Sequence, residues 1–151
     1  MLRRFVSLLV VAAAATSLPA AAQAEDSIAS QIGGLIAMRD ETIGIMNYCY
    51  QNIAQDQAYI EARDAWYLRN GEDIQLIDAG LAKVGGVTDE EKKAIDKTIS
   101  DQVKKDVTDQ PDPAAFCKLF ADRLKSTAQD LSVFAPSSPL LKNVRDWLKT
   151  Q

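Results

Sequence analysis

The chain has 151 residues, 47% hydrophobic and 25% charged, proportions that argue against wholesale disorder, collagen and a coiled-coil rod. Without residues 1–24, which contain Arg3 and Arg4, 15 basic side chains remain against 21 acidic ones, a net charge of −6. This charge argues against nucleic acid and anionic membranes as partners.

Residues 1–24 have the three parts of a secretory signal peptide. Arg3 and Arg4 form a basic tip, residues 5–15 are apolar, and small residues lead up to Ala24. We therefore expect cleavage after Ala24, leaving residues 25–151 as a single domain. Because a transmembrane helix needs about 20 apolar residues, we expect no stable membrane insertion after processing. The predicted location is the periplasm or the extracellular medium.

Two cysteines, Cys49 and Cys117, are the only ones in the chain. Export to an oxidising compartment favours a disulfide between them over two buried thiols. A shared metal site is the third interpretation, but the chain has no histidine to complete an ordinary zinc site. In the loop-entropy model a bridge of this span contributes roughly 4 kcal/mol.

Residues 25–110 are predicted to be helical, since they contain no proline. Apolar residues spaced by three and four define a first helix: Ile28, Ile32, Leu35, Ile36, Ile43, Met46, Cys49 and Ile53. Glycines at 33, 34 and 44 weaken it and predict a kink or a close approach between helices. A second helix is expected over 56–70, with Gly71 as a left-handed terminator. A further stretch over 74–84 stops at Gly85-Gly86, either as a separate helix or as part of a bent one.

From residue 88 onward the signals for helix starts are clearer. Thr88 and Glu91 match a capping box, followed by a narrow apolar stripe typical of a helix on the outside of a bundle. Asp112 and Pro113 predict the start of a helix that ends near Phe134. A second proline-containing break over 135–139 precedes a short helix over 140–148. We therefore expect an all-α fold, a single compact bundle of five or six helices, in which a Cys49–Cys117 disulfide ties the first helix to the fifth.

The sequence offers no recognisable catalytic chemistry. The absence of histidine removes the commonest general base and metal ligand, and the glycine doublets fit no phosphate-binding loop. We therefore expect no catalytic residue, no cofactor and no metal. Abundant carboxylates leave a carboxylate-based hydrolase as the least favoured function.

One helical stripe combines the residue types found at binding hot spots. Tyr59, Arg63, Trp66 and Asn70 share one helix face, and Arg69 lies beside them. They form either a candidate partner surface or the packed side of a helix. We expect Trp66 to be largely buried, with Arg63 and Arg69 facing solvent.

These features favour a non-catalytic, exported protein that binds another protein of the cell envelope or the medium, as an adaptor, chaperone, inhibitor or immunity protein. The alternative is a carrier that holds a small apolar ligand between helices. The sequence leaves the partner and the oligomeric state open.

Overall fold

The structure is a computed structural model that describes residues 20–151, with side chains from Ile28 onward. The predicted signal peptide and its cleavage site therefore lie outside the residues described in full. The described part contains six α-helices and no strand, which confirms the all-α bundle. The helices are α1 (Ala20–Tyr48), α2 (Gln57–Arg69), α3 (Gly71–Lys83), α4 (Asp89–Thr108), α5 (Pro113–Lys125) and α6 (Ser138–Leu148).

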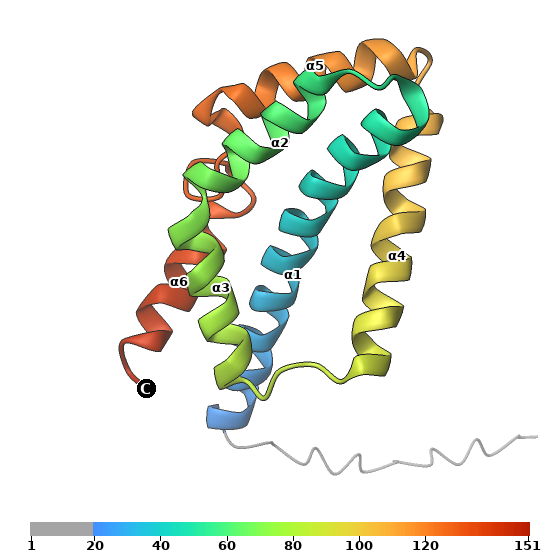
Figure 1. Cartoon of the computed structure of the whole chain (residues 1–151). Helices are drawn as coiled ribbons and strands as arrows, with labels where there is room; N and C mark the ends of the chain where they lie inside the picture. Colours follow the sequence, from blue (N-terminus) through green and yellow to red (C-terminus); the bar gives the residue numbers. More distant parts are fainter. Residues whose placement is uncertain (1–19) are drawn as a thin grey trace, which may run out of the picture.

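The long helix α1 runs through the middle of the bundle and contacts every other helix (Figure 1). All members of its predicted apolar stripe lie in the core or pack against it, and Ile32, Leu35 and Met46 are fully buried. After Tyr48 the helix continues as one wider π turn, Cys49–Ile53. The periodicity of three and four in the sequence therefore identified the core side of α1 correctly.

Helices α2 and α3 are separate, and they meet at Asn70. The prediction for Gly71 is wrong, because this glycine begins α3 and is not in the left-handed region. Asn70, with φ −95° and ψ 9°, makes the turn instead. Within residues 20–151 only Gly85 and Gly86 have positive φ, at 101° and 71°, so the predicted stop after α3 is confirmed.

The start of α4 is the predicted capping box. The Thr88 hydroxyl accepts from the Glu91 amide at 3.2 Å, and the Glu91 carboxylate accepts from the Thr88 amide at 2.8 Å. Val103 and Val107 are buried, whereas Ile95 near the other end of the helix is 37% exposed. Helix α4 therefore packs mainly through its carboxyl-terminal half.

Helix α5 begins as predicted, with Asp112 accepting from the Ala115 amide at 3.0 Å. It ends at Lys125, so the expected end near Phe134 is wrong. The cause is Ser126, whose extended backbone leaves the helix and whose hydroxyl donates to the Arg123 carbonyl at 2.8 Å. A single 3-10 turn, Thr127–Gln129, follows.

The predicted disulfide is present and joins the π turn after α1 to α5. The two sulfur atoms of Cys49 and Cys117 are bonded, and both residues are fully buried. This bond and the contacts between α2 and α5 close one end of the bundle.

Candidate functional site

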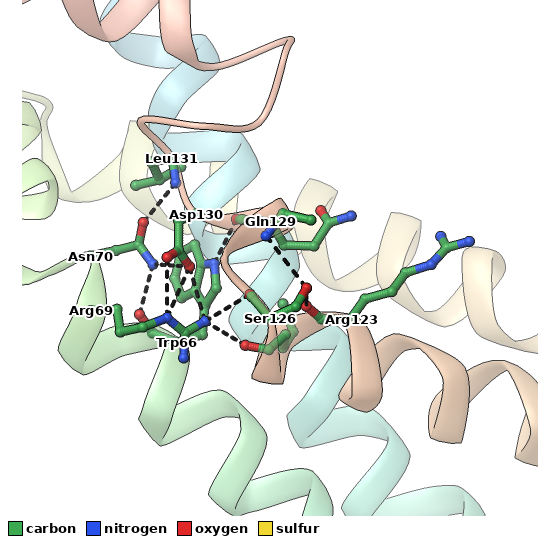
Figure 2. Close-up of polar contacts among 10 residues, drawn as sticks. Trp66, Arg69, Asn70, Arg123, Ser126, Gln129, Asp130 and Leu131 are labelled. Carbon is green, nitrogen blue, oxygen red and sulfur yellow. Dashed lines mark hydrogen bonds and ion pairs between the residues drawn. The ribbon is translucent and has the colours of Figure 1, made fainter.

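The predicted hot-spot stripe on α2 lies largely in the core. Tyr59 is 5% exposed, Asn70 is 1% exposed and Trp66 is fully buried, as expected for Trp66. The Trp66 indole nitrogen donates to the Gln129 carbonyl at 2.7 Å (Figure 2). A buried indole with a satisfied N–H is typical of a structural anchor.

Arg69 binds the segment that follows α5. Its guanidinium forms an ion pair with Asp130 at 2.9 Å and donates to the carbonyls of Leu124 at 2.5 Å and Ser126 at 3.1 Å (Figure 2). Arg69 is exposed at the surface, as expected, with 29% of its side chain accessible, but its guanidinium is held by these internal partners. It stabilises two carbonyls at the end of α5, groups that a helix leaves unpaired.

Asn70 completes this arrangement from a buried position. Its side-chain oxygen accepts from the Leu131 amide at 2.6 Å, and its nitrogen donates to the Trp66 carbonyl at 2.7 Å and to Asp130 at 3.2 Å. We call Trp66, Arg69, Asn70 and Asp130 the α2 latch, because they fasten α2 to the chain after α5.

Arg63, the remaining member of the stripe, is 27% exposed and lies outside the latch. Its guanidinium donates to Asn47 at 2.5 Å and pairs with Asp64 at 2.6 Å. The α2 stripe therefore offers a partner little free surface, and its burial favours the structural interpretation.

A different part of the molecule contains a sizeable hollow. An apolar groove of about 520 Å³ lies between α1, α3, the connection after α3, and α4. Its lining residues are Ala29, Gly33, Ile36, Ala37, Leu81, Val84, Gly86, Val87, Ala94, Ile95, Thr98 and Ile99. Thr98 is the only one with a polar side chain. The volume lies within the range of about 300–1,000 Å³ that small-molecule sites occupy.

The groove exists because α4 leans away from α1 toward the amino-terminal end of α4 (Figure 1). Near the other end the helices touch: a Cβ placed on Gly44 would lie 3.1 Å from Val103, which confirms the predicted close approach there. At the groove Ala37 on α1 and Ala94 on α4 are small, and a Cβ on Gly33 would meet nothing within 4 Å. Small side chains on diverging helices leave the space unfilled.

A second hollow, of about 260 Å³, adjoins the groove, and we call it the charged shelf because five of its nine lining residues are charged, although its exposed lining is mostly apolar. It shares Ile36, Leu81, Val87 and Ile95 with the groove and adds Arg39, Asp40, Asp78, Lys92 and Asp96. Arg39 pairs with Asp40 at 2.7 Å and with Asp78 at 2.9 Å, joining α1 to α3. An amphiphile could therefore place its apolar part in the groove and its polar part on the shelf.

Two carboxyl groups face each other elsewhere between α1 and α4. Burial, and then the neighbouring Asp106 carboxylate, raise the pKa of Glu41 above its ordinary value of 4.5. The hollow beside Glu41 has only about 130 Å³, and Asp106 does not line it. The raised pKa thus reflects burial and repulsion between two neighbouring carboxylates.

Two further properties bear on the site. Within the described residues, no group of three or more His, Cys, Asp or Glu side chains could hold a metal ion. Among the helices of residues 20–151, none combines the length and apolar character needed to span a membrane.

Comparison with known proteins adds no likeness on which a function could rest. The chain matches no protein-family model, no curated protein and no solved structure.

Sequence patterns did not predict the groove. The one feature that could have indicated it is the row of small residues Ala29, Gly33 and Ala37, spaced by four on one face of α1. We read the glycine there as a weakness of the helix. The hollow depends on how α4 diverges from α1, which local spacing does not specify.

Proposed function

We propose that this is a non-catalytic binding protein that holds a small apolar ligand in the groove between α1, α3 and α4. The observation that carries the proposal is the groove itself, with about 520 Å³ and an almost wholly apolar lining. Sites for small molecules in helical bundles are built between helices in this way. The groove is partly open to solvent, so a ligand can enter without unfolding of the bundle.

The arrangement favours a ligand carrier over the partner surface expected on α2. Tyr59, Trp66 and Asn70 are buried, and Arg69 is bound within the latch. In the groove, by contrast, Val87 and Ile95 are 44% and 37% exposed, so their apolar surface remains available to a ligand. The buried disulfide supports the further proposal that the protein works in an oxidising compartment, the periplasm or the extracellular medium.

A second candidate is a helix of another envelope protein, which would occupy the same groove. The spacing of four between Ala29, Gly33 and Ala37 favours it, because rows of residues at this spacing receive the ridges of a packed helix. With such a partner the protein would act as an adaptor or inhibitor, as expected from the sequence, but through the groove and not through α2.

Substitutions at Gly33 test the groove directly. The probe is N-phenyl-1-naphthylamine, whose fluorescence rises in apolar surroundings. We expect Gly33→Ala to keep binding, because its methyl group meets nothing, and Gly33→Leu to fill part of the groove. The leucine side chain should exclude at least two methylene groups of the ligand from the groove, each worth about 0.8 kcal/mol of binding free energy. We therefore expect Gly33→Leu to lower the affinity about tenfold or more.

Both variants replace a helical glycine, so neither should unfold the protein. Equal probe binding by the two variants, or no binding by the original chain, would contradict the proposal. Affinity capture from the native envelope, with mass spectrometry of proteins and small molecules, separates the two candidates. A protein captured in fixed proportion by Gly33→Ala but lost with Gly33→Leu would support the second candidate.

A further inference from the structure

We infer that the ligand of the groove is an amphiphile with one positively charged head group, and that the charged shelf receives this head. The inference rests on the proposed function and names the class of ligand. Its basis is the position of the shelf, which shares four lining residues with the groove and so lies where the polar end of a bound amphiphile would emerge.

The charges on the shelf leave one negative charge uncompensated. Three carboxylates, Asp40, Asp78 and Asp96, face two cations, Arg39 and Lys92. Arg39 is 18% exposed and already binds both Asp40 and Asp78. Its positive charge is therefore shared between two carboxylates and is poorly available to an anionic head.

Asp96 is the group best placed to receive a cation. It lies between the shelf and a third hollow of about 370 Å³, lining both, and Asp40 on the facing helix does the same. Among the ion pairs of the described residues, none includes Asp96. The third hollow also contains Gln51 and Ser100, whose side-chain oxygen atoms can contact an ammonium group.

Lys92 is the one group that could instead attract an anion. It lines the shelf but not the third hollow, and it is exposed to solvent. On α4 it stands four residues before Asp96 and three after Asp89, spacings at which opposite charges attract each other. The net charge of −6 that remains beyond residue 24 adds a general attraction for cations.

The test compares three ligands with the same ten-carbon chain: decyltrimethylammonium, 1-decanol and decanoate. Each displaces N-phenyl-1-naphthylamine below its micelle concentration, at low ionic strength, where charge effects are least screened. We expect decyltrimethylammonium to bind about fivefold more tightly than 1-decanol, a typical upper value for one exposed charge pair. Decanoate should bind more weakly than 1-decanol.

Matched variants assign the effect to the shelf. Asp96→Asn should weaken decyltrimethylammonium about threefold and leave 1-decanol unchanged. Asp101→Asn on the same helix makes the same change in net charge outside the hollows, and it should alter neither affinity. Lys92→Gln should strengthen decyltrimethylammonium, because it removes a repelling charge.

Three results would overturn the inference: tightest binding of decanoate, equal binding of all three ligands, or equal effects of Asp96→Asn and Asp101→Asn. These failures are distinct from failure of the proposed function. If 1-decanol binds and Gly33→Leu abolishes that binding, the groove is a ligand site even when the head group has no influence. If neither 1-decanol nor the probe binds, the proposed function itself fails.

Discussion

Two regions of the bundle are built in opposite ways. In one region the α2 latch joins α2 to the segment after α5 through a buried indole, an amide and an ion pair. In the other region α1 and α4 diverge, and a groove remains beside the small residues of α1. Large aromatic and hydrogen-bonding residues thus close the region that provides stability, whereas the other region stays open.

This contrast predicts that stability and binding can be changed separately. Trp66 and Asn70 of the latch are enclosed, so truncating either one leaves a cavity or an unpaired polar group. Residues of the groove have empty space beside them, so added atoms there cost the fold little. The predictions below test this separation, beginning with the largest expected effect.

Breaking the latch at Trp66 should have the largest effect. Trp66→Ala removes a fully buried aromatic side chain and should lower the free energy of unfolding by roughly 3–5 kcal/mol. Urea denaturation followed by far-UV circular dichroism measures it. As a control, Trp66→Phe keeps most of the volume and loses only the bond to Gln129, so it should cost less. A loss below about 1 kcal/mol for Trp66→Ala would contradict the buried position.

Removing the Asn70 side chain should have an intermediate effect. Asn70→Ala leaves the Leu131 amide without its acceptor and should cost about 1–3 kcal/mol, the usual penalty for a buried unpaired donor. The same denaturation experiment applies, with the exposed Asn52→Ala as control. Hydrogen exchange should also show faster exchange of the Leu131 amide. Unchanged exchange there would show that Asn70 does not hold this segment.

A pair of glycines compares a tightly packed position with an open one directly. Gly33→Ala adds a methyl group in empty space and should stabilise α1 by about 0.5–1 kcal/mol. In Gly80→Ala the new Cβ would lie 3.1 Å from both Ile32 and Val144, so crowding should cancel or reverse the same gain. Thermal unfolding of both variants measures the difference. Equal stabilisation would mean that α3 packs less tightly than described.

The smallest effect should come from Glu41 and depend on pH. Its pKa is raised in the folded state, by burial first and by Asp106 second, so the ionised form opposes folding. This cost is present at neutral pH and disappears as the pH falls through the raised pKa toward 4.5. Glu41→Gln should therefore raise stability at pH 7 by less than about 1 kcal/mol, and the gain should shrink on acidification. Melting temperatures at pH 7 and pH 4.5 measure it, and a gain that grows in acid would contradict the assignment.

Local patterns in the sequence predicted most of the fold. The apolar stripe of α1 and the caps at Thr88 and Asp112 depend on residues within a few positions of one another, and the structure confirms them. The end of α5 was missed because the apolar spacing continues to Leu131, while Ser126 breaks the helix through its own hydroxyl. Gly71 was misread because Asn70, held by distant partners, makes the turn instead.

The long-range contacts of the latch and the shape of the groove could not be predicted from such local patterns. Trp66 was expected to be buried, but its acceptor at Gln129 and the shared partner Asp130 lie some 60 residues away. The groove depends on the angle between α1 and α4, which follows from packing between whole helices. Periodicity identifies which side of a helix is buried, but it does not give that angle.

The close contact between Gly44 and Val103 is a pivot about which α4 would tilt relative to α1. Val103 packs against the α1 backbone at Gly44, and Ala94 in the groove lining lies nine residues before Val103 on α4. At 1.5 Å per residue, Ala94 lies about 13 Å from Val103 along the helix, so tilting α4 by about 4° would move Ala94 by about 1 Å. A larger side chain at the contact, as in Gly44→Ala, would therefore change the width of the groove although Gly44 does not line it.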